Sequence, residues 1–204
     1  MKIEKIATYF QNGLKKHLKK GDILYREGDS PTGIYLIESG LIGLFHLAPN
    51  GKETFLRVFD NENTIGHRSF FAKELYHATS MALAPTIVRY LSKDQFEKMI
   101  NDHPEILREI LEKVSIDLGN AELRMSGHQD KTAAGRIIES IVFLKLKYPT
   151  QVWTRKLIAD FSGSTIETVT RVLNKLEKTK DITKQGRDFS IIDPSNLLKK
   201  INQF

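Results

Sequence analysis

Residues Ser162–Lys178, SGSTIETVTRVLNKLEK, predict an amphipathic helix with two distinct faces. At 100° per residue, four apolar side chains at spacing i, i+3, i+4, i+7 share one face, which we expect to be buried. They are Val169, Val172, Leu173 and Leu176. The opposite face is polar and carries Glu167, Arg171, Asn174 and Lys178, flanked by Thr168 and Lys175. Such a helix either buries one face and leaves the other in solvent, or presents the polar face to a partner.

The residues on both sides of this helix favour the second interpretation. Ser162, Gly163 and Ser164 separate it from an earlier helix, TRKLIADF (154–161), and a short turn containing glycine between two such helices is the helix-turn-helix pattern. Ser164 and Glu167 have the spacing of a capping box, which predicts that the second helix begins there. The following stretch, DITKQGRDFSIIDP (181–194), predicts a two-stranded hairpin with Gly186 in its turn, a wing. The polar N-terminal face of a recognition helix enters the major groove, where Arg bonds guanine and Glu accepts from cytosine N4.

The charge distribution agrees with a nucleic-acid partner for this part of the chain. The 204 residues carry a net charge of +6. Residues 130–204 hold 14 Lys/Arg and 8 Asp/Glu, whereas residues 1–129 hold 17 of each, so the whole excess lies at the C-terminal end. A concentrated positive charge favours binding to nucleic acid; the alternative is a solvated basic surface.

Composition excludes several classes of function. There is no cysteine, which excludes disulfides, thiolate nucleophiles and any zinc or iron–sulfur site built on cysteine. No apolar run approaches the roughly 20 residues of a membrane span, and the N-terminus lacks the apolar core of a signal peptide. We therefore expect a cytoplasmic protein without a membrane partner. We also expect no enzyme, because no nucleophile–base set, metal-ligand set or phosphate-binding glycine loop is present; His67, Glu74 and His77 lie close in sequence without a recognised geometry.

The first hundred residues read as short strands between turns. DILYREGD, GIYLIESG, LIGLFHLAPNG, ETFLRVFD and HATSMALAPTIVRYL are separated by glycine-containing turns, which predicts a β-sandwich, jelly roll or barrel. After Ser92 the period becomes helical, first in KDQFEKMI and then in a long stretch that begins near Pro104. The fold class is therefore α+β.

The long helix carries a heptad pattern. Its apolar residues recur at steps of 4, 3, 4, 3 and 4 and form what we call the seam: Leu107, Leu111, Val114, Leu118, Ala121 and Met125. A single seam of this kind is buried most readily against its own copy, which predicts a parallel homodimer. The alternative is that the seam packs on the β-rich domain. Ile106 and Ile110 lie beside the seam and offer a separate contact to that domain, which would leave the seam free.

The order of β-rich domain, seam helix and winged helix-turn-helix resembles the cyclic-AMP receptor protein/FNR (Crp/Fnr) family of bacterial transcription regulators. GDILYREGD…GIYLIESGLIGLF resembles the first strands of the family's β-roll, and TAAGRI the start of the helix after its hinge. TRKLIADFSGSTIETVTRVLNKLE matches the helix-turn-helix without a gap, and DITKQGRDFSIID resembles the wing. The resemblance covers nearly the whole chain. It implies a cyclic-nucleotide-binding-like sensor in residues 1–103, a dimerisation helix and hinge in 104–130, and a DNA-binding domain in 131–204.

The resemblance also implies residue roles toward DNA. Thr154 and Arg155 match positions that touch the phosphate backbone, Glu167 and Arg171 match base-reading positions, and the wing cations would lie near phosphates. The full predicted set is Thr154, Arg155, Thr165, Glu167, Thr168, Arg171, Lys175, Lys184 and Arg187. Ile166 stands where the family often has Arg; it either contacts a thymine methyl or extends the core stripe, and we favour the core. The implied partners are a palindromic double-stranded site, a second copy of the chain and, for an activator, RNA polymerase. The alternative is a ligand- or partner-binding module whose winged helix does not read DNA.

The effector motif of the family is degraded in this chain. In TIGHRSFFAKELYHATSMAL (64–83), Gly66 matches the family's glycine, but His67 stands where an acid would bond a ribose, and the region of His77, Ala78 and Thr79 lacks the phosphate-binding Arg. Ala121 and Glu122 replace the hydroxyl pair that meets the base. This pattern argues against cyclic AMP.

Other effectors remain as alternatives for this segment. Arg68 and Ser69 could form an anion site with backbone N–H groups, or a solvent-facing loop. Haem binding would need His67 or His77 as a ligand, but lone histidines are more often ordinary surface or core residues. The absence of cysteine excludes an FNR-type iron–sulfur cluster. We expect an unidentified effector or none. A ligand would act by shifting the seam helix and turning the DNA-binding domains about a hinge at residues 127–131.

Overall fold

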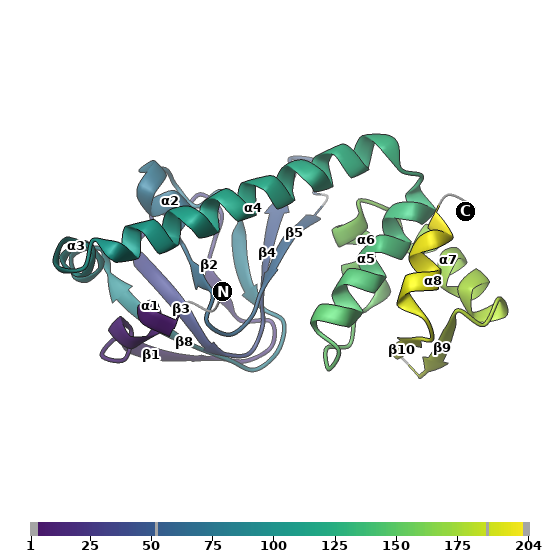
Figure 1. Cartoon of the computed structure of the whole chain (residues 1–204), viewed down its shortest axis with the longest axis horizontal. Coiled ribbons are helices and arrows are strands. Elements are labelled where there is room, and N and C mark those ends of the chain that lie inside the picture. Colours follow the sequence, from purple (N-terminus) through teal and green to yellow (C-terminus); the bar gives the residue numbers. More distant parts are fainter. Residues whose placement is uncertain (1–3, 52, 187, 202–204) are drawn as a thin grey trace. The chain divides into compact units, whose positions relative to one another are not determined.

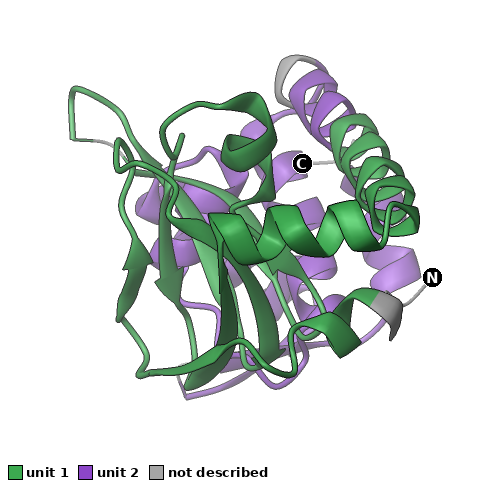
Figure 2. Cartoon of the chain, turned by 90° about the vertical axis from the view of Figure 1, so that its left-hand side faces the viewer, with its two compact units in different colours: residues 1–120 green, residues 121–204 purple. Residues whose placement is uncertain are grey.

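The computed structural model describes residues 4–51, 53–186 and 188–201. Contacts between Cα atoms divide the chain into two compact units, unit 1 (residues 1–120) and unit 2 (residues 121–204) (Figure 2). The long helix α4, Glu105–Asp130, contributes to both units. Within the described residues, no helix has both the length and the apolar character that crossing a membrane requires.

Unit 1 is built on two antiparallel four-stranded sheets (Figure 1). One sheet has the order β1 (Leu14–Leu18), β8 (Thr86–Ser92), β3 (Gly33–Ser39), β6 (Thr64–Ile65). The other has the order β2 (Ile23–Tyr25), β7 (Thr79–Ala82), β4 (Ile42–Leu47), β5 (Glu53–Phe59). The short strands and antiparallel pairing confirm the jelly-roll-like architecture, and with the helices that follow they confirm the α+β class.

Strand β3 shows how the sequence produces the core of this unit. Successive side chains of a strand point to opposite faces. Ile34 and Leu36 pack in one buried cluster, whereas Tyr35 and Ile37 pack in another with residues of both sheets. Because both faces of β3 are covered, the strand is a nearly continuous apolar run rather than an alternating one.

The helices of unit 1 cover one of these two clusters. They are α1 (Glu4–Tyr9), α2 (His67–Ala72), α3 (Lys93–Asp102) and the first part of α4. Helix α3 begins where the period was expected to change, because Ser92 and Gln95 form a capping box. Ile106 and Ile110 of α4 are buried in the cluster with Ile34 and Leu36, which confirms their predicted contact to the β-domain.

Unit 2 contains the winged helix-turn-helix. It comprises α5 (Ala133–Lys147), α6 (Arg155–Ser162), α7 (Ile166–Lys178), the hairpin β9 (Ile182–Gln185) and β10 (Asp188–Ile191), and α8 (Pro194–Lys199). The predicted hairpin is confirmed, with Gly186 at positive φ in its turn. Helix α4 continues through Gly127 to Asp130, and Thr132 caps the start of α5, so the chain changes direction at Lys131.

Candidate functional site

The helix-turn-helix is fixed by three local caps. The Thr154 hydroxyl accepts from the Leu157 N–H at the start of α6. Gly163 ends α6 in the left-handed region at φ 63°, where its N–H donates to the Ala159 carbonyl. At the start of α7, the Thr165 hydroxyl accepts from the Thr168 N–H. The predicted capping box of Ser164 and Glu167 is therefore wrong by one residue.

Helix α7 has the two faces that its sequence predicts. The apolar stripe of Val169, Val172, Leu173 and Leu176 is buried. The polar residues of the opposite face are exposed: Glu167, Arg171, Asn174, Lys175 and Lys178. Ile166 is 46% exposed, so its interpretation as an extension of the core stripe is wrong. An exposed apolar side chain in the first turn leaves the thymine-methyl contact as its predicted role.

Hydroxyl groups on this face hold Arg171 in place. The Thr165 and Thr168 Oγ1 atoms lie 3.1 Å apart, and Arg171 Nη2 donates to Thr168 Oγ1 at 3.2 Å. The backbone N–H of Glu167 and the Thr165 hydroxyl keep the pKa of the Glu167 carboxyl below its usual value. The first two turns of α7 therefore present a fixed guanidinium and an ionised carboxylate to solvent, the donor and the acceptor that base edges require.

Many lysines of unit 2 are paired with carboxylates of the same unit. Among the residues that the structure describes, these pairs are Lys131–Glu139, Lys145–Asp188, Lys156–Asp160, Lys184–Glu177 and Lys200–Asp181. Within the same part of the chain, neither Arg155 nor Arg171 forms an ion pair with a carboxylate, and both are exposed. The guanidinium groups of Arg155 and Arg171 are thus available to an outside anion, whereas the five lysines in these pairs are committed to carboxylates.

The remaining residues predicted to contact DNA lie around α6, α7 and the wing. Thr154 and Arg155 mark the start of α6, where the threonine hydroxyl is engaged as the cap. Lys184 lies on β9 and contacts side chains of α7. Arg187 lies outside the described residues. The DNA roles of the whole set stay predictions.

In unit 1, the predicted effector residue His67 is buried at the start of α2. Its Nδ1 atom lies 3.4 Å from Thr64 Oγ1. Burial lowers the pKa of His67 to about 4, and the nearby cations Lys113 and Arg57 add to the effect while Asp117 opposes it. The ring is therefore neutral at pH 7, and its pKa responds to three charged groups that no sequence pattern connected with it.

Two of these charged groups contact each other, and the third contacts the turn before β6. Arg57 Nη1 pairs with Asp117 Oδ2 at 2.7 Å, and Arg57 Nη2 donates to the Asp117 carbonyl at 3.1 Å. Lys113 Nζ donates to Asn63 Oδ1 at 2.6 Å. A sequence pattern could have placed Lys113 and Asp117 near the β-domain. They continue, at steps of 4, 3 and 4, the face of α4 that begins with Ile106 and Ile110.

The other predicted effector residues have the following surroundings. Arg68 is exposed and pairs with Glu74 at 3.2 Å, and the buried Ser69 hydroxyl donates to the Leu75 carbonyl. His77 is exposed, whereas Ala78 belongs to the core between the sheets. The rest are placed as follows: Gly66 at φ 90° before α2, Thr79 accepting from the Glu27 N–H, and Ala121 and Glu122 exposed on α4.

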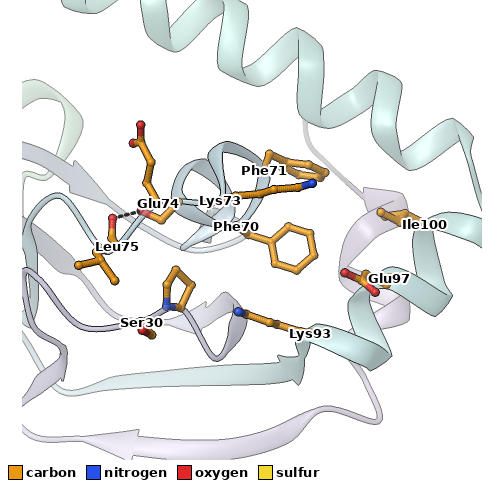
Figure 3. Close-up of a pocket in the computed structure, with 11 residues that line it drawn as sticks. Ser30, Phe70, Phe71, Lys73, Glu74, Leu75, Lys93, Glu97 and Ile100 are labelled. Atoms are coloured by element: carbon orange, nitrogen blue, oxygen red, sulfur yellow. Dashed lines mark hydrogen bonds between the residues drawn. The ribbon is translucent and has the colours of Figure 1, made fainter.

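A separate groove of about 680 Å³ lies between α2, α3 and the loop at Ser30 and Pro31 (Figure 3). Phe70, Phe71 and Ile100 supply its apolar surface, and Lys73, Lys93, Glu74 and Glu97 its charges. Of the predicted effector residues, only Ser69 lines it. The groove is thus distinct from the charged cluster around His67, and cations and carboxylates are balanced along its walls.

The buried His67 predicts a specific pH dependence of stability. Its pKa is about 4 in the folded chain and 6.5 in the unfolded chain, so the unfolded chain binds the proton more readily. The free energy of unfolding therefore keeps its full value, as far as His67 is concerned, above pH 6.5. It decreases as the pH falls toward 4, by about 3 kcal/mol in total. We expect the melting temperature of the wild type to fall more steeply over this interval than that of His67→Gln. Parallel slopes would show that His67 ionises normally in the folded protein.

The seam of α4 is exposed in the single chain, in contrast to Ile106 and Ile110. Leu111 is 66% exposed and Leu118 60%, and Leu107, Val114 and Met125 are also exposed. Large exposed apolar residues repeated along one helix face mark an interaction surface. The structure thus bears out the separation of the two α4 faces.

Comparisons with known proteins agree with this architecture. A cyclic nucleotide-binding domain model matches residues 15–103, and a Crp-like helix-turn-helix domain model matches residues 135–200. The transcriptional activator protein Anr of Pseudomonas protegens is 25% identical over an alignment of 189 residues that covers 88% of this chain and 77% of Anr. The nitrogen fixation regulation protein FixK of Bradyrhizobium diazoefficiens is 27% identical over an alignment of 199 residues that covers 91% of this chain and 81% of FixK.

Solved structures show the same fold. FixK2 from Bradyrhizobium japonicum superposes with a TM-score of 0.81 at 20% identity, and the match covers 92% of this chain and 96% of the FixK2 chain. The c-di-GMP responsive global regulator CLP of Xanthomonas campestris has a TM-score of 0.83 at 17% identity, covering 92% and 98%. With a β-roll, a long helix and a winged helix-turn-helix that all match, the chain belongs to the Crp/Fnr family of transcription regulators.

Proposed function

We propose that this regulator is a homodimer that reads a palindromic DNA site with α7 of each protomer. The observation that carries the proposal is the exposed Arg171, which Thr168 orients and which forms no ion pair with a carboxylate of the described chain. Glu167 and Arg171 read base edges, Thr154 and Arg155 contact the phosphate backbone, and the seam joins the protomers. The sensor, dimerisation and DNA-binding parts correspond to residues 1–103, 104–130 and 131–204.

Selection from a random-sequence duplex pool tests this proposal. Two-fold symmetry predicts that the enriched site is palindromic, with half-site centres about one helical turn, or roughly 34–36 Å, apart. The affinity falls steeply with salt, because counterions are released when cations meet phosphates. Enrichment of a single asymmetric site, or no enrichment, would contradict the proposal.

The sensor domain does not respond to a cyclic nucleotide. His67 replaces the acid that bonds a ribose, and the buried ring lies close enough to Lys113, Arg57 and Asp117 for their charges to affect its pKa. Any effector of this domain belongs to another chemical class. Its binding affects the DNA-binding domain through α4 and the change of chain direction at Lys131.

A thermal-shift titration with cyclic AMP and cyclic GMP measures this directly. A ligand at 100 times its Kd adds about 2.7 kcal/mol of stability, which shifts the melting temperature of a chain of this size by roughly 5–10 °C. We expect a shift below about 1 °C for both nucleotides. A full shift with either one would make the protein a cyclic-nucleotide sensor in spite of His67.

A further inference from the structure

The ammonium group of Lys184 on β9 is held by two side chains of α7. Its Nζ atom donates to Asn174 Oδ1 at 2.7 Å and to Glu177 Oε2 at 2.6 Å. Asn174 and Glu177 are three residues apart and are therefore neighbours on the surface of the helix. The Lys184 side chain is only 24% exposed. Its positive charge is thus committed within the protein, on the side of α7 that faces the wing.

We infer that Lys184 is a positioning residue that fixes the wing on the recognition helix, and that it does not neutralise a DNA phosphate. This inference rests on the proposed function, because it concerns how the domain engages DNA. It replaces the phosphate contact that the family resemblance implies for this position. A lysine that already has a carboxylate and an amide oxygen as partners would have to give up both contacts to reach a phosphate.

The second strand of the wing is anchored on a different helix, α5. Lys145 of α5 is only 10% exposed, and its Nζ atom pairs with Asp188 at 2.5 Å and lies 5.1 Å from the centre of the Phe189 ring. Phe189 is the residue paired with Lys184 in the hairpin register. One strand is therefore tied to α7 and the other to α5, and the two ties together set the direction in which the turn at Gly186 projects.

The two roles of Lys184 make opposite predictions for Glu177→Gln. If Lys184 positions the wing, removing the carboxylate loosens the hairpin and weakens DNA binding. If Lys184 contacts phosphate, the same change releases the ammonium and strengthens binding. Glu139→Gln is the matched control, because it removes the carboxylate of the Lys131–Glu139 pair in the same unit and changes the net charge equally.

The experiment measures the Kd of the full-length chain for a duplex selected by the wild type from a random pool, at several NaCl concentrations. We expect Lys184→Met to weaken binding by about two- to tenfold, the range that exposed ion pairs allow, with an unchanged slope of log Kd against log [NaCl]. Glu177→Gln weakens binding relative to Glu139→Gln, and the double variant Lys184→Met/Glu177→Gln is no weaker than the worse single variant. Lys184→Arg, which can keep both contacts, binds like the wild type.

Two results would overturn the inference while leaving the proposed function intact. One is a salt slope of Lys184→Met that is lower by about 0.9 per protomer, the change expected for one lost phosphate contact. The other is tighter binding by Glu177→Gln than by Glu139→Gln. If the wild type selects and binds no duplex, the proposed function fails and the inference fails with it, so the two failures are distinguishable.

Discussion

Arg171→Ala is expected to remove the sequence preference of the protein for its operator. The guanidinium of Arg171 is held by Thr168 on the exposed face of α7, where it can bond a guanine edge through two donors. Each such pair contributes about 1–3 kcal/mol of discrimination, and a palindrome contains two of them. The two pairs together account for about 2–6 kcal/mol, so the affinity of the dimer for its selected site should fall about 30-fold or more, toward its affinity for unrelated duplex. Competition binding with operator and scrambled duplexes measures the change.

Two variants separate base reading from general charge in this experiment. Arg171→Lys keeps the positive charge but loses the planar fork, so it should lose most of the preference as well. Arg155→Ala should weaken binding to both duplexes alike and lower the salt slope by about 0.9 per protomer, as expected for a phosphate contact. If Arg171→Ala kept the wild-type preference, α7 would not read bases through this residue, and a partner-binding module would become the better interpretation.

The double variant Leu111→Glu/Leu118→Glu is expected to convert the proposed dimer into a monomer. Both leucines are largely exposed in the single chain and lie on the seam. Burying a leucine contributes about 1.5–3 kcal/mol, so a dimer loses on the order of 6–12 kcal/mol from its four leucines, before the cost of burying carboxylates. Sedimentation at micromolar concentration should show one species of about 23 kDa, the mass of a single chain.

The control for the seam is Leu123→Glu. Leu123 is 73% exposed, at least as much as the two seam leucines, but it lies on the opposite side of the heptad pattern. We expect this variant to stay dimeric. The seam variant should also bind the palindrome at least 100-fold more weakly than the Leu123 variant, because the two recognition helices, now on separate monomers, lose their shared effective concentration. A dimeric Leu111→Glu/Leu118→Glu protein would place the subunit interface elsewhere.

Sequence periodicity predicted the parts of this fold that depend on local geometry. The buried stripe of α7, the glycine turn before it and the hairpin after it follow from side-chain spacing and from the positive φ that Gly163 and Gly186 adopt. The same reasoning separated Ile110 from the seam, because residues one step apart on a helix point in different directions. The short helices α1 and α8 were missed, since neither is long enough to show a period.

The spacing of residues in the sequence could not predict contacts between residues far apart in the chain. It also could not decide which of two adjacent residues caps a helix. Ser164 and Thr165 can both cap a helix, and the structure uses Thr165. Arg57 and Asp117 are 60 residues apart, so only the packing of α4 against the β-domain brings their ion pair together. The contact between Lys184 and Glu177 depends in the same way on how the hairpin packs against α7, which no local sequence pattern predicts.

The pairing of lysines with carboxylates inside unit 2 has a consequence for how the regulator finds its target. Affinity for arbitrary genomic sequence comes almost entirely from cations that release counterions, and much of the lysine charge in the described part of unit 2 is already balanced internally. Under the proposed function, such a regulator should leave non-target stretches quickly and sample many of them in a given time. Its dwell time on the target would then be set by the base contacts proposed for Glu167 and Arg171.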